Sequence, residues 1–341
     1  MSKLLIAVKE GNFHEVKRLV DHGADVNSEN YYHASPLHFA ASSGSLEIVK
    51  YLVQHGADVN FENHRVGRPL HSEASSGSLE NVQYLVEHGA EVNFDFIYYG
   101  SPLHSAVSSG SLEIVKYLVD HGADVNFESS DSDIGSPLHS AASSGSLKIV
   151  KYLVDHGADV SCENRYVGRP LHSAASPGSL EMVKYLVEHD ADINCKNWLN
   201  KPVIHNAVKF GSLEMFKYLV EHGAELTNQE NLDMSRILFL ACKGGNTLIV
   251  EYLLQHGAIK DVNNWKLKSP LRIACLKGHT AVVQTLMKYN VDIRKENLEK
   301  EPLICRNNEI INILNVELKK SLKHRKKITI LKGMDNVNLT K

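Results

Sequence analysis

Histidine is the side chain in this sequence that most readily suggests catalysis or metal binding, because imidazole serves as a general base and as a common metal ligand. The chain of 341 residues has 19 histidines, and 14 of them recur at two fixed positions of a repeating pattern. Six occupy the first position: His38, His71, His104, His139, His172 and His205. Eight occupy the second: His22, His55, His88, His121, His156, His189, His222 and His256.

The spacing of these histidines argues against a shared metal ion. Equivalent residues on successive helical units stand about 8–10 Å apart, which is the distance between packed helices. Zinc needs nitrogen ligands at about 2.0–2.1 Å. We therefore expect no metal site among the repeated histidines, and we assign them structural hydrogen bonds near helix ends.

Cysteines and sequence motifs give no sign of catalysis either. The five cysteines form an odd set without a close pair, which favours neither a disulfide framework nor a zinc knuckle. Cys242 and Cys275 occupy equivalent positions of adjacent units, where other units have alanine, so we expect them in the core. No phosphate-binding loop, dinucleotide fingerprint, nucleophile elbow or HExxH motif occurs. We predict a non-catalytic protein without a cofactor or a small-molecule substrate.

A glycine marks the repeat that must position these residues. It falls at Gly11, Gly44, Gly77, Gly110, Gly145, Gly178, Gly211, Gly245 and Gly278. The resulting period of about 33 residues indicates that each unit is one supersecondary element, which buries its apolar face only by stacking on its neighbours. We predict nine stacked units.

Local chemistry predicts two helices in each unit. Ser35, Ser101, Ser136 and Ser269 each precede a proline, a pair that favours a helix start because the hydroxyl caps backbone N–H groups. The marker glycine ends this first helix. In the fifth unit the second helix has Leu147, Val150, Leu153 and Val154 on one face, which predicts a buried stripe.

The second helix ends at a His-Gly pair in most units. Asp190 and Asn290 replace that glycine in two of them. Aspartate and asparagine are the residue types that, after glycine, most readily adopt the left-handed backbone conformation. We therefore predict that conformation at both positions.

The helix openings resemble those of the ankyrin-repeat family. Its Pro-Leu-His-x-Ala pattern occurs at residues 36–40, 102–106, 137–141 and 170–174, and the resemblance covers roughly residues 4–315. The resemblance implies an all-α solenoid of stacked helix-turn-helix units with projecting β-hairpin or loop fingers. Arg68 and Arg169 depart from the pattern by replacing the hydroxyl residue that opens the first helix. We expect the repeat array over residues 1–318, with a truncated copy from Pro302, and a basic tail over residues 319–341.

Aromatic and arginine side chains between the helices are the candidate contact residues, because these types anchor protein interfaces. The resemblance implies that the fingers and the exposed faces of the first helices line a concave partner surface. The candidates are Tyr31, Tyr32, Arg65, Tyr98, Tyr99, Arg165, Tyr166, Trp198 and Trp265. Phe61, Phe94 and Phe127 recur at the same position of successive units, so they either join this surface or stack on one another as scaffold.

We therefore expect a monomeric scaffold that binds an as yet unidentified protein. An alternative is an adaptor whose C-terminal segment recruits ubiquitin ligase or other host machinery. Some ankyrin proteins of large viruses and intracellular bacteria have such C-termini, so this alternative makes the chain an effector of such a microbe or virus.

Charge and hydropathy bear on partners and compartment. Residues 319–341 have eight Lys or Arg against one Asp, a net charge of +7; the whole chain has −3, which leaves −10 on the part before the tail. An acidic body argues against nucleic-acid binding except weakly through the tail; nuclear import, membrane-surface contact or a solvated helix end are the tail's other interpretations. No membrane-spanning run or signal peptide is evident. We expect a cytoplasmic protein, or one in the host cytoplasm or nucleus for an effector.

Overall fold

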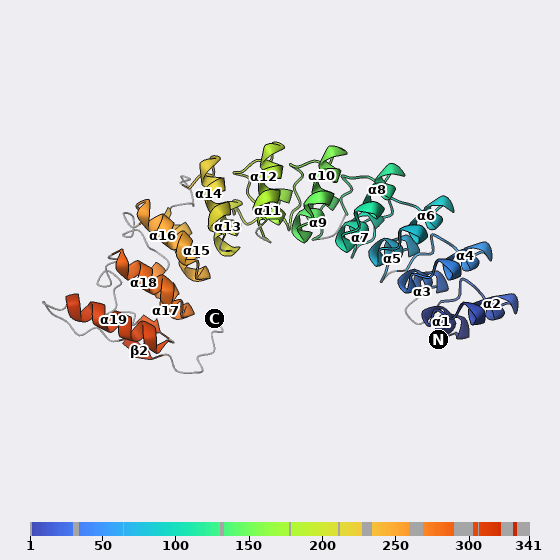
Figure 1. Ribbon diagram of the computed structural model, residues 1–341, viewed down its shortest axis with the longest axis horizontal. Coiled ribbons are helices and arrows are strands. Elements are labelled where there is room, and N and C mark those ends of the chain that lie inside the picture. Colours follow the sequence, from blue (N-terminus) through green and yellow to red (C-terminus); the bar gives the residue numbers. More distant parts are fainter. Residues whose placement is uncertain are drawn as a thin grey trace. The chain divides into compact units, whose positions relative to one another are not determined.

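A computed structural model describes residues 2–29, 34–63, 65–129, 133–176, 179–210, 212–226, 234–258, 269–289, 303–305, 307–321 and 330–332. The chain divides into two compact units. Figure 1 shows the helices of both, coloured along the sequence. The first comprises residues 1–192 and 196–200, and the second comprises residues 193–195 and 201–341. Each unit is built from successive pairs of short helices, as the period predicts.

In the first unit the helices form two rows. Each first helix packs against its own second helix and against the first helices of adjacent repeats, while the second helices contact one another in the same order. The first helices are α1 (Lys3–Lys9), α3 (Pro36–Ser43), α5 (Pro69–Ser76), α7 (Pro102–Ser109), α9 (Pro137–Ser144) and α11 (Pro170–Ala175). The second helices are α2 (Phe13–Asp21), α4 (Leu46–Gln54), α6 (Leu79–Glu87), α8 (Leu112–Asp120), α10 (Leu147–Asp155) and α12 (Leu180–Glu188).

The second unit continues the same pairing. Its pairs are α13 (Ile204–Phe210) with α14 (Leu213–Glu221), α15 (Met234–Gly244) with α16 (Thr247–Gln255), and α17 (Pro270–Lys277) with α18 (Thr280–Lys288). Strands β1 (Leu303–Cys305) and β2 (Ile330–Lys332) pair in parallel, which the sequence did not predict. Helix α19 (Asn308–Ser321) extends past residue 318 and packs against α18, with Ile310 and Leu314 buried.

The apolar stripe of the second helices forms the core. In α10, Val150 and Leu153 are fully buried together with Ile149, while Leu147 and Val154 are half-buried. Full burial of a Val, Leu or Ile side chain contributes about 1.5–3 kcal/mol, so this stripe is the main source of stability in each repeat. Cys242 and Cys275 are completely buried, as predicted for small apolar side chains.

The turns confirm the predicted left-handed positions. Gly110 and Gly145 end their helices with φ of +79° and +81°. Asp190, which replaces glycine after α12, has φ of +67°. Gly178, Gly211 and Asn290 lie outside the described residues. No helix in the described part of the chain is long and apolar enough to cross a bilayer.

Asparagine side chains join successive repeats beyond the second helices. Asn93 Nδ2 donates to the carbonyl oxygen of Gly122 at 2.8 Å, and Asn93 Oδ1 accepts from the N–H of Asp124 at 2.8 Å. The same pair of bonds is made by Asn27, Asn60, Asn126 and Asn194. Ser161 stands at this position in the fifth repeat. We call this series the asparagine ladder.

The opening serines differ from the prediction in three repeats. Ser269 Oγ accepts from the N–H groups of Leu271 and Arg272, as expected for a cap. Ser101 Oγ instead lies 3.0 Å from His104 Nδ1, and Ser35 and Ser136 contact their histidines in the same way. The buried imidazole Nδ1 also accepts from the serine N–H, so the opening residue contacts this ring through both its backbone and its hydroxyl.

Candidate functional site

Among the connections that the structure describes, three short turns project between the helix pairs. In one of them the Phe96 N–H donates to the Gly100 carbonyl at 3.0 Å and the Gly100 N–H donates back to the Phe96 carbonyl at 2.7 Å, forming one antiparallel bridge. Residues 63–67 and 164–168 form the same bridge. We call these three segments the fingers. The bridge closes the base of each finger, and the described residues between its ends are exposed or half-buried at the tip.

The histidines of the first helices hold the fingers in place. His71 Nε2 lies 3.1 Å from the carbonyl oxygen of Gly100 in the following repeat. A carbonyl oxygen only accepts, so Nε2 carries the proton and donates, which leaves Nδ1 to accept from the N–H of Arg68 at 3.3 Å. Equivalent bonds join His38 to Gly67, His104 to Gly135 and His139 to Gly168.

Burial keeps these imidazoles neutral. It lowers the pKa of His71, His104 and His139 to about 4, against the partly opposing effect of the backbone hydrogen bonds. A neutral ring with both nitrogens bonded has no proton or lone pair left for catalysis. The predicted structural role of this set of histidines is confirmed at these positions.

The second set of histidines is also structural. His55 Nδ1 lies 2.8 Å from the carbonyl oxygen of Tyr51, and the two rings pack with their centroids 4.0 Å apart. The same Tyr–His pair recurs in the later repeats that have both residues. Within the described ranges, no three His, Cys, Asp or Glu side chains are grouped so that they could hold a metal ion.

The recurring phenylalanines belong to the scaffold, but not by stacking on one another. Each is half-buried and meets the imidazole of the preceding first helix edge-on, with centroids 6.0–6.2 Å apart. The pairs are Phe61 with His38, Phe94 with His71, and Phe127 with His104. Arg68 also covers Phe94, with its guanidinium 3.6 Å from the ring centroid, and forms an ion pair with Glu91 at 2.7 Å.

Most of the predicted contact residues that the structure describes are well exposed. The exposed fractions are 66% for Tyr98, 53% for Tyr99, 52% for Tyr166 and 58% for Trp198. Arg65 and Arg165 are exposed as well, and the guanidinium of Arg165 lies 5.7 Å from the ring of Tyr166. Tyr31, Tyr32 and Trp265 lie outside the described residues.

One finger is stiffened from below by Phe96, which the sequence analysis did not place among the candidates. Phe96 is buried and stacks on Tyr99 with centroids 5.8 Å apart, and it meets Tyr98 edge-on at 5.7 Å. Aromatic pairs in these geometries are favourable beyond the area they bury. Tyr98 and Tyr99 are therefore exposed and held in position at the same time.

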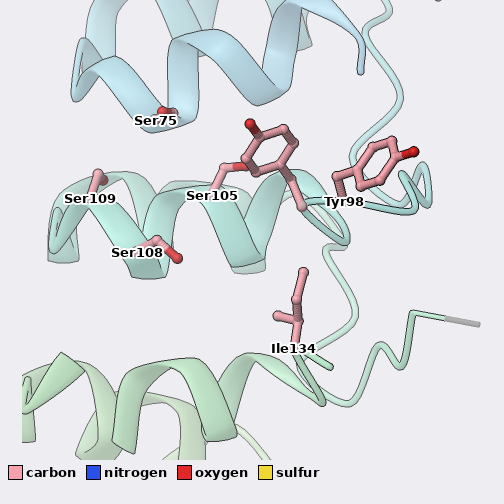
Figure 2. A pocket seen from close by; sticks show the side chains of 7 residues that line it. Ser75, Tyr98, Ser105, Ser108, Ser109 and Ile134 are labelled. Atoms are coloured by element: carbon pink, nitrogen blue, oxygen red, sulfur yellow. The ribbon is translucent and has the colours of Figure 1, made fainter. Parts of the chain in front are cut away.

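A pocket of about 380 Å³ opens beside this finger (Figure 2). Figure 2 shows Ser75 on the upper helix, Ser105, Ser108 and Ser109 on the middle helix, and Ile134 reaching toward the pocket from the next connection. Tyr98 and Tyr99 complete its lining, which is hydroxyl, phenol and alkyl without any charged side chain. The serines and Ile134 were not among the predicted contact residues; the Ser-Ser pair before the marker glycine was the signal available for the helix side.

Comparison with known proteins agrees with this architecture. The family model of ankyrin repeats (3 copies) matches residues 1–63, 61–129, 127–197 and 204–297, so the chain belongs to the ankyrin-repeat family. The chain is similar to the crystal structure of the human ASB11 ankyrin repeat domain, with 27% identity and a TM-score of 0.60. That match covers 67% of this chain and 100% of the other. The comparison with curated proteins found no match. Ankyrin repeats generally mediate protein–protein interaction and are generally non-catalytic.

Proposed function

We propose that this chain is a non-catalytic scaffold that binds a partner protein through its fingers and the adjoining first helices. The observation that carries this proposal is the exposure of Tyr98, Tyr99, Tyr166 and Trp198 on short, bridged or hydrogen-bonded turns. Tyrosine, tryptophan and arginine dominate the binding energy of protein interfaces. Side chains that are already held in place lose little further freedom when they bind.

The pocket beside Tyr98 and Tyr99 indicates the chemistry of the partner. Its volume of about 380 Å³ falls in the range of sites that take small organic groups. Its lining has no charge, so it favours an uncharged side chain, apolar or aromatic, whose edge meets serine hydroxyls. We propose that one such side chain of the partner protein inserts into this pocket, while the exposed residues of the other fingers contact the surrounding surface of the partner.

A long charged side chain at the pocket tests this proposal. Ser108 is exposed on α7, so Ser108→Arg fills the pocket without entering the core. We expect it to weaken capture of any partner from cell extract at least tenfold, as should replacement of Tyr98, Tyr99, Tyr166 and Trp198 by alanine.

Two matched controls separate binding from folding. Gln54→Arg adds the same charged side chain at an exposed position of a second helix, α4, which lies outside the proposed surface and does not line the pocket. Leu248→Ala removes an exposed apolar side chain from a second helix, α16. Both should retain the partner, and all variants should keep the wild-type melting temperature. Unchanged capture by Ser108→Arg and by the fourfold alanine variant would contradict the proposed surface.

A further inference from the structure

The third repeat contains two polar residues where its neighbours are apolar. Glu73 in α5 stands at the position of Ala106 in the next repeat, and Asn81 in α6 stands at the position of Ile114. Both side chains are fully buried, with 0% exposed surface. Asn81 Nδ2 donates a hydrogen bond to Glu73 Oε2 at 2.9 Å. The repeat has therefore exchanged a methyl and a branched alkyl group for a carboxyl–amide pair.

The pairing is incomplete as it stands. Glu73 Oε1 and Asn81 Oδ1 are both buried and have no hydrogen-bond partner. Both are acceptors while the carboxyl is ionised, so neither satisfies the other. One proton on Glu73 Oε1 changes this, because the resulting hydroxyl can donate to Asn81 Oδ1 after rotation about the broad terminal torsions. A carboxylic acid and an amide then share two hydrogen bonds in a closed ring.

We propose that Glu73 and Asn81 form a proton-dependent latch between α5 and α6. With Glu73 protonated, two hydrogen bonds join the helices and no buried acceptor in the pair is left unsatisfied. With Glu73 ionised, a buried charge and two unpaired oxygens remain, and the third repeat is loosened. The latch is independent of the proposed binding function, since it concerns the cohesion of one repeat.

The surroundings of Glu73 favour the proton over a counter-ion. Burial raises its pKa to about 7, against opposing hydrogen bonds from Asn81 and Ser76. Other titratable groups on α5 and the helices packed against it are His38 on α3, His71 on α5, His104 on α7, and Glu80, Tyr84 and Glu87 on α6. Within the described part of the chain, no charged neighbour contributes to the shift. Among the described residues no counter-ion neutralises this carboxyl, so a proton does.

The sign of the pH dependence follows from the raised pKa. A glutamate in the unfolded chain releases its proton near its ordinary pKa of 4.5, whereas Glu73 in the folded repeat keeps it to about 7. The folded state therefore holds one more proton in that window, and the folding equilibrium constant falls by about tenfold for each pH unit of increase. Above pH 7 the loss is complete and the constant levels off.

Buried histidines oppose this trend in the wild-type protein. The pKa values of His71 and His104 are lowered to about 4 in the folded protein. The stability that these neutral rings contribute to the folded state is therefore lost as the pH falls below about 6.5. The pH dependence of the latch is therefore measured as the difference in stability between the wild-type protein and a variant that keeps these histidines. Glu73→Gln is the matched variant, because a glutamine amide donates to Asn81 Oδ1 and accepts from Nδ2 at every pH.

The experiment is hydrogen exchange of the full chain between pH 5 and pH 8.5, followed in peptides from α5 and α6. We expect the protection of wild-type relative to Glu73→Gln to fall about tenfold per pH unit up to pH 7 and then to stay constant. The double variant Glu73→Ala with Asn81→Ile restores the residues of the fourth repeat and should track Glu73→Gln without a pH-dependent ratio. A ratio between wild-type and Glu73→Gln that does not change with pH would overturn the latch.

A second measurement uses the wild-type protein, so it does not depend on whether a variant folds. The 13C chemical shift of the Glu73 carboxyl, followed by NMR in the wild-type protein, should titrate with a midpoint near pH 7. A midpoint below pH 5.5 would equally overturn the proposal, because the carboxyl would then be ionised throughout the neutral range.

Discussion

In four of the first helices, α3, α5, α7 and α9, a single imidazole joins three parts of the chain. In the fourth repeat, His104 accepts from the N–H of Ser101 through Nδ1 and donates through Nε2 to the Gly135 carbonyl of the next repeat. Each such bond to a buried group contributes about 0.5–1.5 kcal/mol when made, and leaving its partner unpaired costs about 1–3 kcal/mol. The histidine thus couples the start of a helix to the position of the following finger.

The same ring predicts a difference between two glycines of the fourth repeat. Gly100 and Gly110 both have positive φ, of +67° and +79°. A Cβ on Gly100 would lie 2.8 Å from His104 Nδ1, whereas one on Gly110 would meet nothing within 4 Å. We expect Gly110→Ala to lower the free energy of unfolding by about 1 kcal/mol and Gly100→Ala to lower it by about 2–4 kcal/mol. Urea denaturation measures both; equal losses would show that the ring moves aside at no cost.

Single residues are also where sequence reasoning reached its limit. The periodicity identified the histidines as structural, but it could not say that the serine hydroxyl would bond to the imidazole instead of the helix. That choice depends on where the Nε2 proton goes, which is set by a carbonyl in another repeat. Glu73 and Asn81 were missed because the repeat pattern was followed at its best-preserved positions, while these two residues depart from it.

At the scale of elements, the asparagine ladder ties five helix pairs to the pairs that follow them, through two bonds per asparagine. Asn93→Ser introduces the residue that Ser161 already supplies in the fifth repeat, with a shorter side chain that cannot reach both Gly122 and Asp124. Because the site is exposed, water replaces part of what is lost, and we expect unfolding to become easier by about 0.5–1.5 kcal/mol. Differential scanning calorimetry would record this loss as a lower melting temperature than that of the wild-type protein. An unchanged melting temperature would mean that the asparagine ladder does not stabilise the stacking of the repeats.

Helix positions and turns could be predicted well from the sequence, because glycine, proline and the apolar spacing act locally. The second helices, the left-handed Asp190 and the buried Cys242 and Cys275 followed from those signals alone. The pocket could not be predicted, since its lining comes from α5, α7, one finger and the next connection. The pairing of β1 with β2 joins segments that are distant in the sequence, and no local pattern indicates such a partner.

For the whole molecule, nearest-neighbour stacking predicts that damage in one repeat stays partly confined. Leu153 is fully buried in α10, so Leu153→Asp places an unpaired charge in the core at a cost above about 4 kcal/mol. We expect hydrogen exchange to show lost protection in α9 to α12 while α1 to α6 retain most of theirs, and thermal melting to resolve two transitions. Lys148→Asp, at an exposed site of the same helix, is the control and should melt as wild-type does. One cooperative transition in Leu153→Asp would contradict nearest-neighbour coupling.

The bridged finger at residues 96–100 has a consequence for how such a protein changes its partners. Its two ends are fixed by paired amides and by an imidazole from the preceding repeat, whereas the side chains of Ile97, Tyr98 and Tyr99 between them are exposed. These three residues can therefore be substituted, in evolution or by design, while the ends of the finger stay in place. A new partner protein can thus be recognised at this finger without a change in the fold.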